Sequence, residues 1–301
     1  MNRFLIVYNP NSSQYIHVKD EILTKATKIK GRMVGKFAIE KTSFEANTKR
    51  LIRVLRNGDF VLSAGGDATA AICANAILDS NKDVTLAVLP YGNFNDLART
   101  LKTKTMEDVL QDSAVKKFYP LDVFIDGKHW RYATCYVTIG MTAEAVAIFD
   151  QPKIRKKMQE GHKSSWRSYI QLARWYFKNR HKKQFLPDFK LNGKLQHNRA
   201  SDYAAVNGSS MSRVMKGKDD YLKPLTFRSE TERTTSFPRL FLLMVRSIFH
   251  RVPGSDTKGD TLAFVDPSTV ALQAEGEYHT FENIRTIEVK KPTKYLKVIQ
   301  K

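Results

Sequence analysis

The stretch FVLSAGGDATAAICANAIL, residues 60–78, decides the fold prediction. Its apolar start over residues 60–62 is typical of a buried strand, and Gly65-Gly66-Asp67 then breaks the run. Residues 68–78 are rich in Ala, Ile and Leu, which favours a helix. The stretch therefore predicts a strand, a tight turn and a helix with Asp67 as its N-terminal cap.

The same order of strand and turn recurs on both sides of this stretch. Residues 4–8 form an apolar run closed by Asn9-Pro10, and residues 84–89 precede the turn Pro90-Tyr91-Gly92. Helical spacing lies between these runs, as over residues 44–55. Strands that alternate with helices predict an α/β domain with a mostly parallel sheet, which we assign to residues 1–122. Ligands of such sheets bind at the carboxyl ends of the strands.

The second half of the chain changes to short β-rich segments, which predict a second, mainly antiparallel domain over residues 123–289. A strongly basic insertion, residues 151–183, interrupts it. Its centre, residues 166–177, has an aromatic stripe at helical spacing and a basic opposite face. Such a helix either packs its stripe on the core or docks on a membrane, and both readings stay open. The expected strands are residues 123–125, 132–139, 203–206, 262–265, 269–272 and 286–289.

The positive net charge of the chain indicates an anionic partner but does not identify which one. The formal net charge of +20 attracts nucleic acid, anionic membrane surfaces or phosphorylated ligands. We expect no nucleic-acid partner, because neither a helix-turn-helix nor an aromatic-basic RNA motif is evident. The apolar runs are far shorter than the roughly 20 residues of a transmembrane helix, and no secretory signal opens the chain. These features predict a cytoplasmic protein.

Metal chemistry based on cysteine or histidine is not expected. The two cysteines, Cys73 and Cys135, lie far apart, and the seven histidines show no paired spacing. The sequence therefore predicts neither a disulfide framework nor a transition-metal site.

Three loops have the composition of phosphate-binding sites. A phosphate needs close backbone N–H donors, and a strand followed by glycines at a helix start supplies them. Gly65-Gly66-Asp67 has this arrangement, although a simple helix cap would have the same letters. The loop PYGNFNDLAR, residues 90–99, repeats it after the next strand, and residues 9–12 follow the first strand. Neither a P-loop nor a dinucleotide fingerprint explains these loops.

In this order, the three loops resemble the NPxSG, GGDGT and PxGTxNDxAR motifs of the catalytic domain shared by diacylglycerol kinases, sphingosine kinases and bacterial lipid kinases. Residues 139–144, 218–222 and 275–277 are similar to the family's G-F-D-A-E, D-D-G-x-L and D-G-E segments. The resemblance thus covers nearly the whole chain. It implies a nucleotide-binding α/β domain, to which a final strand at about residues 290–301 returns, and a β-sandwich as the second domain.

The resemblance also implies an activity, cofactors and partners. Mg-ATP would donate its γ-phosphate to a lipid hydroxyl in the cleft between the domains, most directly that of diacylglycerol to give phosphatidic acid. ATP and Mg²⁺ are the implied cofactors. A lipid kinase of this kind binds reversibly to an anionic membrane and is peripheral to the inner face of that membrane. The acceptor lipid, the preferred nucleotide and whether the chain forms a homodimer stay open.

Site residues follow from the resemblance position by position. Glu277 matches the general base, and Asp67 and Asp96 would organise magnesium and the phosphates. A structural magnesium site matches Asp219, Asp220 and the Leu222 carbonyl. The nucleotide would be lined by Asn9, Pro10, Asn11, Ser12, Ser13, Thr42, Gly65, Gly66, Asp67, Ala68, Thr69, Ala70, Ala71, Asn93 and Asn95.

The chain departs from the family pattern on its functional loops. Ala68, Asn93, Ser13, Tyr221 and Glu275 stand where the family has Gly, Thr, Gly, Gly and Asp. If position 68 needs a positive φ, alanine costs about 1 kcal/mol there, and its methyl group would crowd a phosphate. Two alternatives therefore accompany the active lipid kinase: a catalytically lapsed relative that binds lipid or nucleotide, and an NAD kinase-like enzyme. An NAD kinase-like enzyme has no counterparts of residues 95–99 and Glu277, and these residues therefore argue against it.

Overall fold

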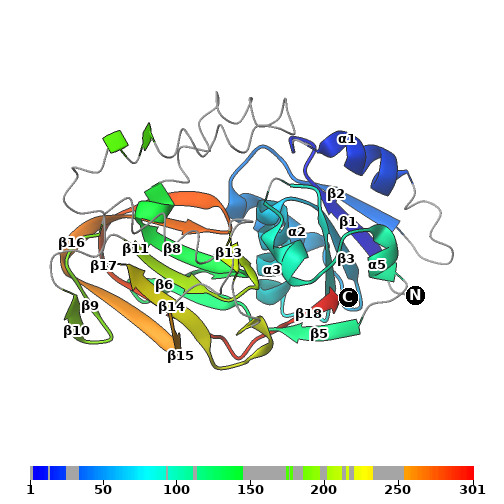
Figure 1. Ribbon diagram of the computed structural model, residues 1–301. Helices are drawn as coiled ribbons and strands as arrows, with labels where there is room; N and C mark the ends of the chain where they lie inside the picture. Colours follow the sequence, from blue (N-terminus) through cyan, green and yellow to red (C-terminus); the bar gives the residue numbers. More distant parts are fainter. Residues whose placement is uncertain are drawn as a thin grey trace.

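The protein has two sheets side by side, with helices between them (Figure 1). This computed structural model describes residues 3–12, 14–24, 34–92, 94–110, 114–144, 174–175, 177–178, 186–196, 202–211, 215–216, 220–232 and 254–301. Ser13, Asn93, Asp219 and most of the basic insertion at 151–183 lie outside the described residues. Among those described, no helix is long and apolar enough to cross a membrane.

The first sheet has six strands in the order β2-β1-β3-β4-β18-β5. Four of its five pairings are parallel, and only β5 runs antiparallel to its neighbour. The predicted α/β class with a mostly parallel sheet is therefore confirmed. The strands are β1 Phe4–Tyr8, β2 Val34–Ala38, β3 Phe60–Gly65, β4 Thr85–Pro90, β5 Ala114–Phe118 and β18 Leu296–Gln300.

Alternating side chains of β1 show how this sheet is covered on both faces. Phe4 and Ile6 pack with residues of the helical turn η1 and of α5, whereas Leu5 and Val7 pack with residues of α2 and α3. Helices α2 and α3 lie between the first sheet and the second domain (Figure 1). The helical segments are α1 Tyr15–His17, η1 Val18–Leu23, α2 Phe44–Val54, α3 Asp67–Ser80, α4 Asp96–Thr100 and α5 Met106–Leu110.

One helix start differs from the prediction. Helix α3 begins at Asp67 itself, and its N-terminal cap is Gly66 in an extended conformation. The prediction of Asp67 as the cap is therefore wrong. The Asp67 carboxylate instead accepts hydrogen bonds from the neighbouring loop, because that loop packs against the start of α3.

The second sheet has ten strands, and all of its pairings are antiparallel, as expected for the second domain. Its main path runs β15-β14-β11-β8-β16-β17-β6-β7. These strands are β6 Leu121–Ile125, β7 Lys128–Ala133, β8 Tyr136–Gly140, β9 Phe189–Leu191, β10 Lys194–Gln196, β11 Asp202–Val206, β14 Phe227–Glu232, β15 Ser255–Thr257, β16 Gly259–Ala274 and β17 Glu277–Lys290. A short ribbon, β12 Ser210–Met211 with β13 Met215–Lys216, and a 3₁₀ turn η3, Asp220–Leu222, complete the domain.

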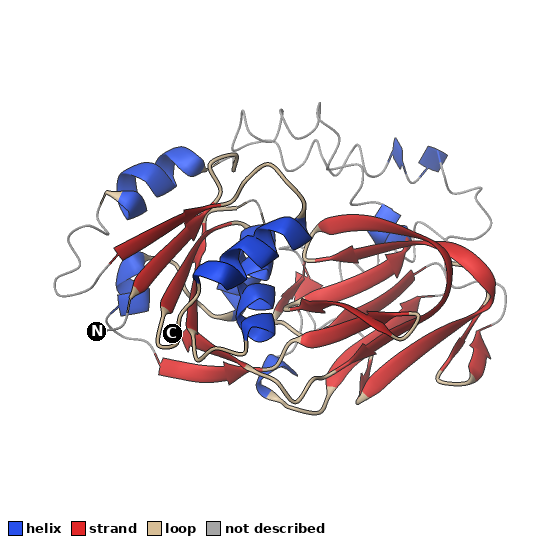
Figure 2. Ribbon diagram, turned by 180° about the vertical axis from the view of Figure 1, so that it is seen from behind, coloured by secondary structure: helices blue, strands red, loops and turns tan. Residues whose placement is uncertain are grey.

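Two strand predictions need correction. Residues 132–139 form parts of two strands, β7 and β8, which are separated at Thr134-Cys135. Residues 262–265 and 269–272 are one strand, β16, which runs through Pro267 where its register against β17 shifts. The long strands β16 and β17 curve along the edge of the domain and join its layers into one hydrogen-bonded sheet (Figure 2).

The chain crosses between the two sheets twice. Residues 119–120 lead from β5 to β6, and residues 291–295 lead from β17 back to β18. The crossings are neighbours, because the rings of Tyr119 and Tyr295 lie 5.9 Å apart.

Candidate functional site

The loops that follow β1, β3 and β4 meet at the carboxyl edge of the first sheet. Gly66 and Gly92 are in backbone contact, so that a Cβ atom at Gly92 would clash with the Gly66 Cα. The Tyr91 N–H donates to the Gly65 carbonyl over 3.1 Å, and the Gln14 side chain donates to the Gly92 carbonyl over 3.3 Å. Glycine is required at position 92 because the two loops approach so closely.

Asp67 holds the loop after β4 in place. Its carboxylate accepts hydrogen bonds from the N–H groups of Asn95 at 2.8 Å and Leu97 at 3.3 Å, at the start of α4. Asn95 has a left-handed backbone with φ 57°, and its side-chain amide binds both the N–H and the carbonyl of Gly92. The Asn-Asp pair at residues 95–96 therefore shapes the loop and turns Asp96 into the first residue of α4.

The remaining predicted nucleotide contacts lie on the same edge or beside it. The Asn9 side chain accepts from the Asn11 N–H over 2.9 Å, and the buried Ser12 hydroxyl has no hydrogen-bond partner among the described residues. Thr69 packs against Gly65, and Ala70 and Ala71 are buried in α3. Thr42 is exposed between β2 and α2, with its N–H donating to the Glu40 carbonyl. The Ser12 hydroxyl is a polar group that a ligand could satisfy.

Ala68 fits its position without strain. It lies in the first turn of α3 and is not among the described residues with positive φ. The backbone cost considered for alanine at this position is therefore absent. Ala68 can therefore affect a bound phosphate only through the steric bulk of its methyl group.

Three carboxylates gather where the two domains meet. Asp96 is 1% exposed and accepts a hydrogen bond from the Tyr136 hydroxyl over 3.3 Å. Glu275, at the tip of the β16–β17 hairpin, accepts from the Cys135 N–H at 2.7 Å and the Thr134 hydroxyl at 2.8 Å. Burial, reinforced by the nearby Asp96, raises the pKa of Asp67 to about 7. Burial, reinforced by Asp67, likewise raises the pKa of Glu275 to about 7.

This carboxylate cluster, defined as Asp67, Asp96 and Glu275, suits a hard divalent cation. Its oxygens are the ligand type that Mg²⁺ prefers, and a cation would stabilise the ionised form of these carboxylates, which burial and the neighbouring carboxylate disfavour. The carboxylate cluster is not a complete metal site. Among the described residues, no three His, Cys, Asp or Glu side chains are arranged to hold an ion by themselves. This fits an ion that arrives with phosphate ligands of its own.

The raised pKa values predict a pH dependence of stability. A carboxyl group whose pKa is higher in the folded state stabilises the fold at low pH, and this contribution is lost as the pH rises from about 4 through about 7. The metal-free Asp67→Asn variant should therefore lose less stability than the wild type between pH 5 and pH 8. Thermal unfolding in buffers of equal ionic strength measures this, and parallel curves for the two proteins would contradict it.

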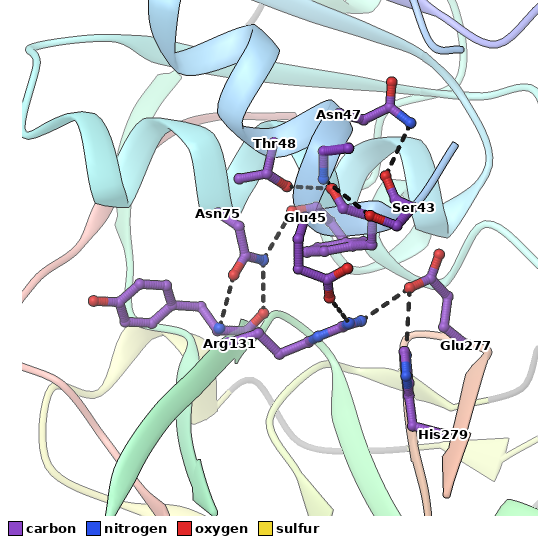
Figure 3. Close-up of polar contacts among 12 residues, drawn as sticks. Ser43, Glu45, Asn47, Thr48, Asn75, Arg131, Glu277 and His279 are labelled. Atoms are coloured by element: carbon purple, nitrogen blue, oxygen red, sulfur yellow. Dashed lines mark hydrogen bonds and ion pairs between the residues drawn. The ribbon is translucent and has the colours of Figure 1, made fainter. Parts of the chain in front are cut away.

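Glu277 lies on the second domain and is held by Arg131 (Figure 3). The Arg131 guanidinium, 3% exposed on β7, donates to Glu277 Oε2 over 2.9 Å and to Glu45 Oε1 of α2 over 3.0 Å. Its central carbon lies 4.0 Å from the ring centroids of Phe44 and Trp130. Burial alone would raise the pKa of Glu45, but a backbone hydrogen bond and the Arg131 charge lower it below its usual value. Arg131 thus ties the predicted base to the first domain.

A second polar contact fixes β7 against α3. The Asn75 side-chain amide exchanges two 2.9 Å hydrogen bonds with the backbone N–H and carbonyl of Tyr132 (Figure 3). Together with the Arg131 bridge, it sets the position of Glu277 relative to the loops of the first sheet.

The loop predicted to hold structural magnesium forms the turn η3. Asp220 is 1% exposed, and its carboxylate lies 3.3 Å from the Lys223 ammonium. The backbone carbonyl of Asp220 accepts a hydrogen bond from Lys291 over 2.9 Å. Tyr221, at the position where the family has glycine, is fully buried.

Sequence reasoning did not single out Arg131, Glu45, Asn75, Tyr136 or Lys291. Their partners lie far away along the chain, as with Arg131 and Glu277, which are 146 positions apart. A buried arginine on a strand has the same letter pattern as an exposed one, so no local signal distinguishes it.

Comparisons with known proteins agree with the motif resemblance. Residues 3–124 match the family model of the diacylglycerol kinase catalytic domain. A diacylglycerol kinase of Staphylococcus saprophyticus is 29% identical over 127 residues, which are 42% of this chain and 38% of that protein. The match therefore spans well under half the length of that relative.

The fold similarity extends over the whole chain. A crystal structure described as a diacylglycerol kinase from Bacillus anthracis superposes with a TM-score of 0.70 at 14% identity, covering 100% of this chain and 97% of that one. The resemblance to the diacylglycerol kinase family and the two-domain fold are thus confirmed.

Proposed function

From a first domain that matches the diacylglycerol kinase catalytic domain over residues 3–124, we propose that this protein is a lipid kinase. It transfers the γ-phosphate of Mg-ATP to a lipid hydroxyl, with diacylglycerol as the leading acceptor and phosphatidic acid as the product. The observation that carries the proposal is the convergence of three loops and the carboxylate cluster, with Glu277 on the second domain tied to α2 of the first domain through Arg131.

The first-sheet loops bind the nucleotide in this proposal. The close packing of Gly66 on Gly92 holds the two loops together at the start of α3, where the backbone N–H groups of the first helical turn would receive the phosphate oxygens. Asp67 keeps the loop after β4 in its shape and, with Asp96, faces the phosphates. Magnesium, when bound with ATP, would neutralise the charge of the phosphates between these carboxylates.

Glu277 accepts the proton of the lipid hydroxyl. Arg131 occupies Oε2 and fixes the direction of the carboxylate, so the substrate hydroxyl approaches through Oε1. A general base must be within hydrogen-bond reach of the proton that it removes, and an ion pair on its other oxygen limits its motion.

A panel of acceptors tests the proposal. The purified protein is incubated with γ-labelled Mg-ATP and, in separate reactions, with dispersed diacylglycerol, sphingosine or NAD. Label in phosphatidic acid is the expected result. Label only in the sphingosine product would keep the lipid kinase and change its acceptor, whereas label in NAD would replace the proposal with an NAD kinase.

We also propose that the basic insertion brings the protein to an anionic membrane, where its substrate lies. Each basic residue near such a surface contributes about 1 kcal/mol, and salt screens this attraction over about 8 Å. Lys153, Arg155, Lys156 and Lys157 changed together to Gln should reduce co-sedimentation with anionic vesicles and leave activity on detergent-dispersed lipid unchanged.

Neutral vesicles and a rising salt series serve as controls for this prediction. Binding of the wild type should fall steeply with salt and should be weak on neutral vesicles. If the quadruple variant sediments like the wild type at low and moderate salt, the docking surface is elsewhere.

A further inference from the structure

Three hairpins of the second domain have the same kind of turn at their tips, with positive φ at both turn residues. The turn residues are the pairs Asp126-Gly127, Asn192-Gly193 and Glu275-Gly276, with φ values from 47° to 81°. Two successive residues of this conformation form the type I′ turn that suits a two-residue hairpin loop. Aspartate and asparagine adopt positive φ several times more readily than most residues do, and glutamate does not share that preference.

The glutamate tip also differs from the other two in its burial. Asp126 and Asn192 are exposed, whereas Glu275 is 4% exposed. A residue keeps a backbone conformation that its type disfavours only where surrounding contacts determine it, and such positions gather at functional sites. The Glu275 side chain therefore does something that the turn by itself does not require.

The Glu275 carboxylate ties the hairpin tip to the β7–β8 junction, which we define as residues 134–136. It accepts hydrogen bonds from the Thr134 hydroxyl at 2.8 Å, the Cys135 N–H at 2.7 Å and the Tyr136 N–H at 3.4 Å. Three donors from consecutive residues thus converge on one side chain. A buried carboxylate with several donors is held firmly in direction as well as in place.

The β7–β8 junction is itself fixed to both domains. The Cys135 carbonyl accepts from the Asn207 N–H at 2.7 Å, and the Thr134 carbonyl accepts from the Asn207 side-chain amide at 2.7 Å. The Tyr136 hydroxyl donates to Asp96 of α4 over 3.3 Å. The junction is therefore a firm support for the hairpin tip.

Glu277 is two residues beyond Glu275 in the same hairpin. It begins β17 and pairs with Ala274 across the turn. Its carboxylate is held by Arg131 over 2.9 Å. The ion pair fixes the end of the Glu277 side chain, while the Glu275 contacts fix the backbone from which that side chain projects.

We propose that Glu275 is a positioning residue, which holds the hairpin tip so that the Glu277 carboxylate meets the lipid hydroxyl. Glu275 acts through Glu277 and does not itself touch the reacting atoms. A shift of about 1 Å in a reacting group can cost about 100-fold in rate, so a tie of this kind matters for turnover. The inference rests on the proposed function, in which Glu277 takes the proton of the hydroxyl.

The variant Glu275→Asn separates the turn from the tie. Asparagine favours positive φ, as at Asn192, but it is one methylene shorter than glutamate and has a single acceptor oxygen. Folded Glu275→Asn should turn over at least about 10-fold more slowly than the wild type, with KM for ATP little changed. The matched control Asp126→Asn, at an exposed tip with the same turn, should match the wild type.

The partner variant Thr134→Val tests the tie from the other side. It removes one of the three donors and leaves the turn unchanged, so turnover should fall by about 3-fold. Should Glu275→Asn not fold, Thr134→Val, alone and combined with Glu277→Gln, decides the question.

Combination with Glu277→Gln distinguishes positioning from a purely structural role. If Glu275 acts through Glu277, adding Glu275→Asn or Thr134→Val to Glu277→Gln should lower turnover no further, because residues that act as a unit are not additive. Circular dichroism at the assay temperature checks that each variant is folded.

Three results would overturn the inference: wild-type turnover in folded Glu275→Asn and Thr134→Val, a double variant in which the two losses multiply, or recovery of Glu275→Asn in excess magnesium. The last would make Glu275 a ligand of the ion. In each case labelled phosphatidic acid from the wild type would leave the proposed function standing. Absence of any labelled lipid with the wild type would overturn both.

Discussion

Glu277→Gln is expected to lower turnover about 100-fold or more while the affinity for nucleotide stays nearly unchanged. An amide cannot take the proton of the lipid hydroxyl, but its oxygen can still accept the hydrogen bond from Arg131 that Glu277 now accepts. The structure around position 277 should therefore persist. Steady-state kinetics with dispersed diacylglycerol and a nucleotide titration measure the two quantities.

The matched control for this prediction is Glu282→Gln. Glu282 is exposed on the same strand, β17, and the change removes the same charge. Wild-type turnover in the control together with a large loss in Glu277→Gln would assign the effect to the position. Equal turnover in the wild type and Glu277→Gln would remove Glu277 from the mechanism.

Arg131→Met should produce the second large effect, on turnover and stability together. Arg131 is 3% exposed and is sandwiched between two aromatic rings, so its loss leaves Glu45 and Glu277 without their shared cation. We expect the free energy of unfolding to fall by about 2–3 kcal/mol, less than for a fully buried pair because both carboxylates are partly exposed. Turnover should fall at least about 10-fold, with KM for ATP little changed.

A lower turnover of Arg131→Met with an unchanged KM for ATP would show that Arg131 positions Glu277 in addition to stabilising the fold. Assays at a temperature where Arg131→Met is fully folded exclude unfolding as the cause, and Arg285→Met, an exposed arginine on β17, is the control. Wild-type turnover of folded Arg131→Met would show that the bridge serves stability alone.

The fold could be predicted from the sequence because its signals are local. The apolar runs at residues 4–8 and 60–62, each followed by a turn, became β1 and β3, and the Gly65-Gly66 break falls where β3 ends. Residues 262–265 and 269–272 were predicted as two strands, whereas they form the single strand β16, in which Pro267 lies at a register shift.

The site could be predicted only in part, because its geometry depends on contacts between distant segments. Motif order brought Asp67 and Asp96 to the same edge, but the role of Asp67 in holding the Asn95 loop requires the packing of Gly66 on Gly92. Arg131 and Lys291 are buried cations on or beside strands, and their letters resemble those of the chain's many exposed basic residues. Their partners become visible only in the folded chain.

The central claim is that this chain moves a phosphate from ATP to a lipid. The most direct measurement follows γ-labelled Mg-ATP and dispersed diacylglycerol with the wild type and Glu277→Gln in parallel, counting labelled phosphatidic acid and released ADP. The account predicts one labelled lipid for each ADP with the wild type, and a loss of about 100-fold or more with the variant. Nucleotide binding by the wild type without any labelled lipid product would contradict it and would identify a catalytically lapsed relative.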